Sequence, residues 1–265
     1  MRLAFSTLGL PGAPLDDVLR LAADHGWQGL ELRCAPGEPV HPELSPDERR
    51  RTAAALARAG IVPLALADYT GVAAPGDDAG IVRELVDRLR LAADLGARHL
   101  RVFPRGGDGP VAEADARAAR RLAAAAATAE ELAVRILVET HDSHRSGRDV
   151  ARLLARPELA GHPAVGALWD LLHTRLAGEP VAVTAAALAP YLGYAQVKDV
   201  AGPDELTPLP LGAGVLPIGA CVRALPADAW VSWEYEAPWY PDAAAFAPLL
   251  ASGAVHLRGL AAETR

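Results

Sequence analysis

The sequence predicts a single (β/α)8 barrel that spans residues 1–265. The chain has 265 residues, which is an ordinary length for this fold. Short apolar runs alternate with longer helical patterns along the whole chain, and such alternation builds a parallel sheet. Eight strand–helix pairs can be recognised. Glycine and proline are scattered over the connections, so no linker or second domain is expected.

The first four strand–helix pairs cover residues 2–133. Apolar residues at helical spacing, with Gly26 as a stop, predict the first helix. Ser45 and Glu48 have the spacing of a capping box, which begins the second helix. The run Ile61–Ala67 is apolar without alternation, as in parallel strands that are covered on both faces. The expected elements are strand Arg2–Thr7, helix Leu15–His25, strand Gly29–Arg33, helix Ser45–Gly60, strand Ile61–Ala67, helix Asp77–Leu95, strand Arg98–Phe103 and helix Val111–Ala133.

The last four pairs cover residues 134–250. They are strand Val134–Thr140, helix Arg148–Ala155, strand Val165–Asp170, helix Val181–Leu188, strand Tyr194–Asp199, helical turns Ile218–Leu225, strand Trp230–Tyr235 and a final helix Asp242–Leu250. The alternative fold is an open, doubly wound sheet, which often carries a glycine-rich phosphate turn after an early strand. Residues 6–12 (STLGLPG) do not fit that G-x-G-x-x-G pattern.

Composition and charge exclude several classes of protein. Hydrophobic residues make up 51% of the chain and charged residues 22%, which is typical of a globular protein. The net charge of −7 argues against a nucleic-acid partner, which would need a basic face. The two cysteines give no disulfide framework, and no signal peptide or membrane-spanning run is present. We expect a cytoplasmic protein without membrane association, and a homo-oligomer is possible.

The basic residues are distributed unevenly between the two types. Lysine occurs once, at Lys198, among 26 lysine and arginine residues. An ammonium is not interchangeable with a guanidinium, because it is compact and titrates more readily. The single lysine therefore marks position 198 as a candidate functional residue.

Polar residues end four consecutive predicted strands. In a barrel of this kind the active site lies at the carboxyl ends of the strands, so these side chains are expected to meet. Three carboxylates at one point need a neutralising partner, and with an amide oxygen they form a hard, oxygen-rich site. Mg²⁺ or Mn²⁺ suits this site best, and Zn²⁺ or Co²⁺ is possible. The simpler alternative is that each residue caps a helix or pairs with an arginine. The four residues are Glu139, Asp170, Gln196 and Glu234.

Several segments resemble the sugar phosphate isomerase/epimerase family, which is the xylose isomerase-like TIM-barrel group. They are 138–144 (VETHDSH), 169–173 (WDLLH), 196–199 (QVKD) and 233–236 (WEYE), with weaker similarity at 5–7 (FST), 29–32 (GLEL) and 211–214 (LGAG), so the resemblance covers nearly the whole chain. It implies that Glu139, Asp170, Gln196 and Glu234 bind one divalent metal ion. Most family members carry histidine where this chain has Gln196. The sugar epimerases of the group carry arginine where this chain has Gly202, which argues against a ketohexose epimerase.

The resemblance implies an isomerase or epimerase that acts on a small sugar, a sugar phosphate or a cyclitol-like ketone. A metal-bound carbonyl makes the neighbouring carbon acidic, so a base can remove its proton and an enediolate forms. Glu139 and Glu234 are expected to remove and return that proton. His173 is expected to contact a substrate hydroxyl, and Lys198 to hold a substrate oxygen or pair with Glu234. The substrate-contacting or supporting residues are expected to be His141, Glu236 and Trp239.

Three other functions stay open at this point. A lyase or dehydratase could use the same metal and base but expel a hydroxyl group. An abasic-site endonuclease shares the barrel, but it would need more metal-binding histidines and a basic groove. A non-catalytic sugar-binding barrel is the third alternative, and the intact carboxylates Glu139, Asp170 and Glu234 argue against it.

Overall fold

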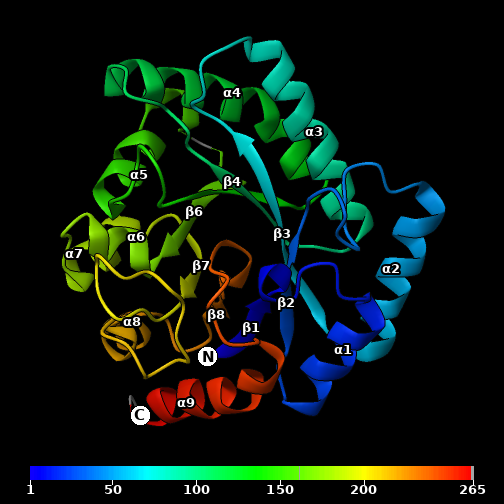
Figure 1. Ribbon diagram of the computed structural model, residues 1–265. Coiled ribbons are helices and arrows are strands. Elements are labelled where there is room, and N and C mark those ends of the chain that lie inside the picture. The colour runs from blue at the N-terminus through cyan, green and yellow to red at the C-terminus, as the bar shows by residue number, and fades with distance from the viewer. Residues whose placement is uncertain (161, 264–265) are drawn as a thin grey trace.

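A computed structural model describes residues 1–160 and 162–263, and within them eight parallel strands close into one barrel (Figure 1). The strands follow one another around the barrel in chain order, so the predicted (β/α)8 fold is confirmed. The strands are β1 (Arg2–Ser6), β2 (Gly29–Arg33), β3 (Val62–Gly71), β4 (His99–Phe103), β5 (Arg135–Glu139), β6 (Val165–Asp170), β7 (Leu192–Val197) and β8 (Trp230–Trp233).

Helices surround the barrel and bury the outer faces of the strands (Figure 1). The capping box predicted for α2 is present, because the Ser45 and Glu48 side chains each bond the other residue's backbone N–H. The α-helices are α1 (Leu15–Asp24), α2 (Pro46–Ala59), α3 (Asp78–Asp94), α4 (Val111–Glu131), α5 (Gly147–Leu154), α6 (Leu171–Leu176), α7 (Val181–Leu188), α8 (Ile218–Ala224) and α9 (Leu250–Ala262). Short 3-10 turns are η1 (Thr7–Gly9), η2 (Pro157–Leu159), η3 (Ala237–Trp239) and η4 (Ala247–Leu249).

The final helix lies later in the chain than the sequence pattern indicates. The prediction of a helix over Asp242–Leu250 was wrong, since α9 begins at Leu250. Pro248 lacks a backbone N–H and would clash with the preceding turn, so a helix that began at Asp242 could not continue through it. The chain forms only the turn η4 there. Helix α9 follows, and it buries Leu250, Ala254 and Leu257 against the core.

A short helix that the sequence pattern did not indicate follows β6 directly. Asp170 is both the last residue of β6 and the N-cap of α6, and its Oδ1 accepts a hydrogen bond from the His173 backbone N–H at 3.1 Å. This cap places the His173 side chain one helical turn beyond Asp170. The tight connection therefore links two predicted site residues.

The barrel interior is apolar at one end and polar at the other. A small apolar cluster of buried side chains fills the part of the interior that lies away from the polar end. It consists of Ala4, Leu64, Ala65, Leu137, Leu168, Tyr194 and Trp230. Buried charged and amide side chains lie beyond this cluster, at the carboxyl ends of the strands. No helix among the described residues is long and apolar enough to span a bilayer.

Candidate active site

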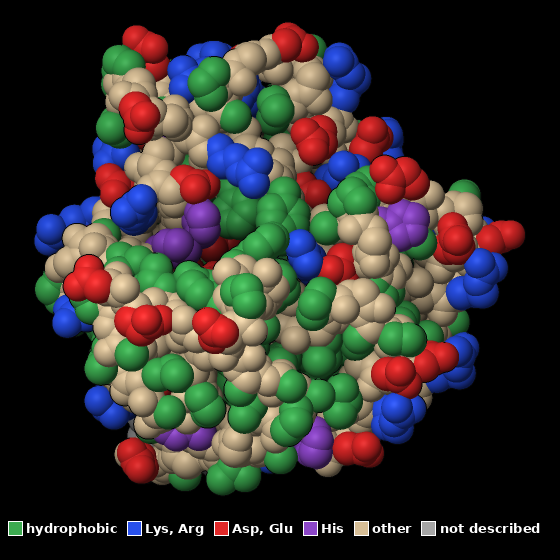
Figure 2. Space-filling model, in the orientation of Figure 1, with side chains coloured by type: hydrophobic (Ala, Val, Ile, Leu, Met, Phe, Trp, Pro, Cys, Tyr) green, Lys and Arg blue, Asp and Glu red, His purple; other side chains and the backbone are tan. Residues whose placement is uncertain are grey.

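The four predicted strand-end residues lie at the same end of the barrel. Glu139 and Asp170 are the last residues of β5 and β6, Gln196 lies one residue before the end of β7, and Glu234 directly follows β8. Asp170 pairs in register with Gln196, which places their side chains beside each other. All four are buried, with exposed fractions between 0% and 4%. Figure 2 shows a hollow in which acidic, histidine and hydrophobic side chains meet, with basic side chains around it.

The single lysine lies among three of the carboxylates. The Lys198 Nζ lies 2.9 Å from Asp170 Oδ2 and 2.6 Å from Glu236 Oε1, and it also donates to Glu234 Oε2. Lys198 itself is only 2% exposed. Buried charges need such partners, so the ammonium neutralises a large part of the negative charge of this end of the barrel.

Gln196 binds carboxylates through its amide nitrogen. Its Nε2 donates to both oxygens of Glu31, at 2.8 and 2.9 Å, and lies 3.3 Å from Glu234 Oε1. The Tyr194 hydroxyl also donates to Glu31. In this arrangement Gln196 Oε1 is buried and has no hydrogen-bond partner. The carbonyl oxygen that was predicted to bind a metal ion is therefore available to bind one.

Glu139 faces an arginine from the neighbouring strand. Arg101 of β4 is 2% exposed, and its Nε lies 3.3 Å from Glu139 Oε2. The two groups are at ion-pair distance but not in hydrogen-bond geometry, since neither atom has a hydrogen-bond partner. The guanidinium lies over the Phe103 ring at 4.2 Å and over the Tyr69 ring at 5.3 Å. Aromatic faces thus hold this cation in the barrel.

The environment separates the pKa values of these carboxylates. Burial raises the pKa of Glu139 well above its ordinary value, although Arg101 opposes the shift. Burial acts the same way on Asp170 and Glu234, but the Lys198 ammonium outweighs it and both pKa values lie below the ordinary range. Burial lowers the pKa of Lys198, and the carboxylates around it more than reverse that effect. Lys198 is therefore a fixed positive charge.

Two histidines lie at the mouth of the barrel beside Glu139. Glu139, His141 and His173 each offer one ligand atom, and these atoms lie within 4.8 Å of one another. The His141 ring lies 4.0 Å from the His173 ring and 4.4 Å from the Phe103 ring, measured between centroids. Burial lowers the pKa of His173 to about 4, so its imidazole is neutral at pH 7. A neutral imidazole can bind a metal ion or accept a proton.

The loop that carries His141 is anchored outside the barrel. His141 and His144 exchange backbone hydrogen bonds of 3.1 and 2.8 Å. The buried His144 contacts Asp115 of α4 through Nε2, at 2.8 Å, and Arg152 of α5 pairs with the same carboxylate. His144 therefore positions the loop and does not reach the site.

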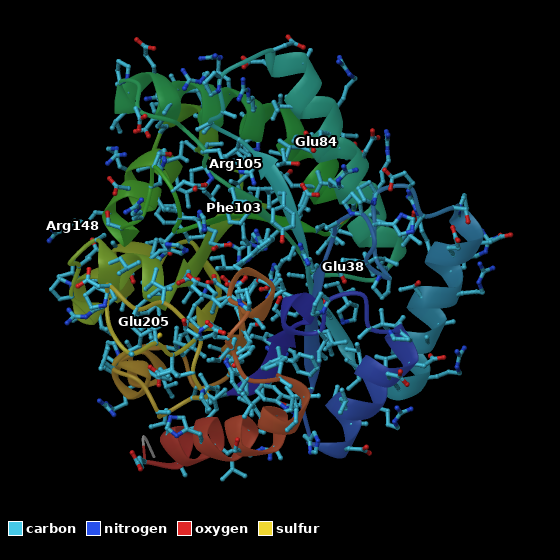
Figure 3. The ribbon with its side chains drawn as sticks, viewed as in Figure 1. Glu38, Glu84, Phe103, Arg105, Arg148 and Glu205 are labelled. Carbon is cyan, nitrogen blue, oxygen red and sulfur yellow. The ribbon has the colours of Figure 1, made fainter. Side chains whose placement is uncertain are left out.

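The remaining predicted residues border the opening. Glu236 contacts Lys198 from above, while Trp239 is 56% exposed and has the guanidinium of Arg33 5.4 Å from its ring. Phe103 and Arg105, which Figure 3 labels, lie together on the β4 side, with the Arg105 guanidinium 5.3 Å from the Phe103 ring. Aromatic and arginine side chains thus surround the mouth.

Two charged residues of the interior, Glu31 and Arg101, were not among the predicted site residues. Each is the middle residue of its strand and lies between apolar residues, in the segments 29–33 (GLELR) and 99–103 (HLRVF), and both side chains are almost fully buried. A charge between apolar residues in the middle of a strand is the signal that identifies them, because burying it requires a partner.

The described residues fit a divalent cation. Glu139 Oε2, Gln196 Oε1 and His173 Nε2 are buried and lack hydrogen-bond partners, and such atoms are suitable ligands. Within the described part of the chain, Glu139, His141 and His173 form the group whose ligand atoms are close enough to share an ion. The four-ligand set of Glu139, Asp170, Gln196 and Glu234 stays a prediction.

A family profile described as "Xylose isomerase-like TIM barrel" matches residues 19–252. No curated protein sequence matches the chain at a significant level. The profile match covers most of the chain and includes all four strand-end residues.

Several crystal structures are similar in fold. The probable 3-DHS dehydratase AsbF of Bacillus anthracis, involved in petrobactin synthesis, shares 16% identity at a TM-score of 0.80, over 97% of this chain and 99% of that one. The IOLI protein with a bound zinc atom shares 18% identity at a TM-score of 0.81, over 100% of this chain and 99% of that one. L-ribulose 3-epimerase shares 18% identity at a TM-score of 0.79, over 99% of this chain and 95% of that one. At these identities the likeness shows the fold alone.

Proposed function

Because the chain belongs to the xylose isomerase-like TIM-barrel family, we propose that it isomerises or epimerises a small carbohydrate-like ketone or aldehyde. The proposed reaction transfers a proton beside the carbonyl group and depends on a divalent metal ion. The observation that carries the proposal is the set of buried carboxylates, Glu139, Asp170 and Glu234, at the open end of the barrel around Lys198. Small polyhydroxy ketones, which form enediolates, are the matching substrates.

The metal ion, when bound, would polarise the substrate carbonyl and stabilise the negative charge of the enediolate. Glu139 would hold it, since this residue belongs both to the four-ligand set and to the group at the mouth. The crystal structure of the IOLI protein contains zinc, which supports a divalent ion on this fold.

Two carboxylates are placed to move the proton. Glu139 lies on β5 and Glu234 follows β8, so they approach the centre of the barrel from different strands. We assign Glu234 the removal of the proton next to the carbonyl, because Lys198 and Gln196 hold its carboxylate in place. Return of the proton to the same carbon with inversion gives an epimer, and return to the neighbouring carbon gives an isomer.

Two further residues of the proposed site act on the substrate oxygens. The neutral imidazole of His173 lies at the mouth, where it can accept the proton of a substrate hydroxyl or bind the metal ion. The permanent positive charge of Lys198, beside Asp170 and Glu234, would stabilise negative charge on a substrate oxygen. Trp239 would form one wall of a sugar-sized pocket above them.

Dehydration is the second candidate reaction, and it is supported by the structural similarity to the probable 3-DHS dehydratase. A dehydratase would use the same base but expel a hydroxyl group from the carbon beyond the enolate. A hydroxyl that leaves needs a proton donor, and His173 would have to supply it. The two reactions therefore differ in product and not in the first step.

A substrate panel tests the proposal. Aldoses, ketoses, their phosphates and cyclitol ketones would be incubated with the Mn²⁺-loaded protein, and the products identified by NMR. Appearance of an epimer or an aldose–ketose isomer supports the proposal, and an unsaturated product identifies a dehydratase. If several sugars bind and none is converted, the chain is a sugar-binding barrel and the proposal is wrong.

A further inference from the structure

Glu31 of β2 holds the amide of Gln196 from across the barrel. The Gln196 Nε2 donates to Oε1 and Oε2 of Glu31, at 2.8 and 2.9 Å. Strands β2 and β7 are not neighbours, so this contact crosses the interior of the barrel. Both side chains have an exposed fraction of 0%. The contact fixes the position of both groups, because bulk water cannot replace either partner.

The chemistry of Glu31 determines which end of the amide faces it. A carboxylate has only acceptor atoms, whereas the amide of glutamine has a nitrogen that donates and an oxygen that accepts. The Tyr194 hydroxyl also donates to Glu31 Oε2, so both carboxylate oxygens serve as acceptors. The other contact of the amide nitrogen is again with a carboxylate, Glu234 Oε1 at 3.3 Å. The nitrogen of Gln196 therefore faces the carboxylates, and the carbonyl oxygen takes the other side of the amide.

This arrangement leaves the carbonyl oxygen of Gln196 without a partner. Its Oε1 is buried and accepts no hydrogen bond. Glu139 Oε2 and Asp170 Oδ2 also lack hydrogen bonds, although Arg101 and Lys198 lie at ion-pair distance from them. Among the described residues, Gln196 is thus the predicted ligand whose buried oxygen no side chain compensates. A buried acceptor of this kind is costly unless a cation binds it.

Turning the Gln196 amide over would remove this metal ligand. The carbonyl oxygen would then face the Glu31 carboxylate, with two negative groups in contact, and the nitrogen would take the place of Oε1. Carbonyl oxygens bind Mg²⁺ and Mn²⁺, whereas the amide nitrogen only donates hydrogen bonds. Because Glu31 excludes the second orientation, it decides whether position 196 can supply a metal ligand.

We propose that Glu31 is a positioning residue, which holds the Gln196 amide so that its carbonyl oxygen is available to the metal ion. Tyr194, from the same strand as Gln196, assists by donating to the Glu31 carboxylate. Metal-binding histidines are commonly held in the same way, by a carboxylate behind the ring nitrogen that does not bind the metal. The inference rests on the proposed function only in requiring a divalent ion at the strand-end residues.

NMR of the wild-type protein measures the use of the carbonyl oxygen directly. The chain contains two glutamines, Gln28 and Gln196, and no asparagine, so selective labelling of glutamine gives two side-chain amides. Saturation with Mg²⁺ is expected to shift the carbonyl ¹³C resonance of Gln196 and to leave that of Gln28 in place. Gln28 is an internal control, because it bonds Leu3 at the opposite end of the barrel. Saturation without a change at the Gln196 carbonyl would overturn the inference.

A double-mutant cycle separates positioning from the loss of a charge. Glu31→Gln keeps the shape of the side chain, but its amide can also donate to Gln196 Oε1, so both orientations of Gln196 become possible. We expect it to weaken Mn²⁺ binding by about tenfold in the wild-type background. In the Gln196→Met background no amide remains to be positioned, and the same change should weaken binding by about threefold or less. Gln196→Met alone should cost about tenfold or more in affinity.

Isothermal titration calorimetry measures the affinity of all four proteins, and circular dichroism verifies that each is folded. Equal weakening by Glu31→Gln in both backgrounds would show that only its charge acts, and it would overturn the inference. Unchanged Mn²⁺ binding by Gln196→Met would overturn it as well. Neither experiment uses a substrate. A protein that shows the expected coupling but converts no sugar would therefore refute the proposed reaction alone, and one that converts a sugar without this coupling would refute only the role of Glu31.

Discussion

The ammonium of Lys198 lies 2.9 Å from the Oδ2 of Asp170 in the interior of the barrel, where the two side chains are 2% and 0% exposed. The lysine is the only one in the chain. A compact ammonium with three donors fits among three converging carboxylates, whereas a planar guanidinium is larger and directs its donors differently. The structure thus gives a physical reason why a chain so rich in arginine retains lysine at this position.

Removal of the Lys198 charge is expected to destabilise the fold. Lys198→Met leaves Asp170, Glu234 and Glu236 without their buried counter-charge, and we expect a loss of about 3–5 kcal/mol in the free energy of unfolding. Urea unfolding followed by circular dichroism measures it. Adding Glu236→Gln should restore part of the stability, since one uncompensated carboxylate is removed. A single variant as stable as the wild type would contradict this account of Lys198.

Loss of either proton-transferring carboxylate is expected to lower kcat. Glu139→Gln and Glu234→Gln keep the shape of the side chain but remove its ability to accept a proton, so kcat should fall by about 10²–10⁴-fold. Glu179→Gln is the matched control, because Glu179 is also buried but it bonds Gly147 and Thr184 outside the barrel. Steady-state kinetics with the substrate found in the panel measure kcat for each variant. Equal kcat values for all three variants would exclude these roles.

The buried His99 is expected to make stability depend on pH. Burial, assisted by Arg135 and Arg98, lowers the pKa of His99 to about 3, and the ring stacks on Tyr194. In the unfolded chain His99 binds a proton near pH 6.5, whereas in the folded protein it stays neutral until the pH approaches 3. The free energy of unfolding should therefore fall by about 1.4 kcal/mol for each pH unit from about pH 6.5 down to pH 3 because of this group.

His99→Gln isolates that contribution. The variant has no titratable group at this position, so its stability should fall less steeply than that of the wild type as the pH decreases below 6.5. Urea unfolding at a series of pH values, with both proteins in the same buffers, measures the difference. Parallel curves for the two proteins would show that His99 titrates alike in the folded and unfolded states.

Trp239 is expected to contribute to substrate binding and not to the chemical step. Its ring is 56% exposed at the mouth and lies beside Arg33. Trp239→Ala should raise KM by about tenfold and leave kcat nearly unchanged, because a wall of the pocket binds the substrate and the transition state equally. A fall in kcat without a change in KM would place Trp239 in the chemical step instead.

Most of the fold could be predicted because each element has a local signal. The apolar runs that became β2, β6 and the other strands, and the capping box of α2, depend on neighbouring residues alone. The final helix was placed wrongly, since the apolar stretch 242–250 contains Pro248 near its end and the true helix begins after it. Helix α6 was missed because its start depends on Asp170 acting as an N-cap directly at a strand end.

The candidate site could be predicted only in part. The chain positions of Glu139, Asp170, Gln196 and Glu234 follow from the strand pattern, and the barrel brings them to one end. Which atoms they use does not follow, because it depends on partners from distant strands. Arg101 beside Glu139 is such a partner, and so is Glu31, which accepts the Gln196 amide. Those two charges lie in the middle of β2 and β4, whereas the predicted metal ligands lie at or near strand ends.

Solvent deuterium exchange tests the central claim, which is proton transfer beside a carbonyl group at the Lys198 and Glu234 end of the barrel. The wild-type protein and Glu234→Gln would each be incubated with the converted sugar and Mn²⁺ in D₂O, and the C–H signals followed by ¹H NMR. The account predicts that the proton next to the carbonyl exchanges with the wild-type protein and is retained with the variant. Conversion of the sugar by the wild-type protein without any exchange at that carbon would contradict it.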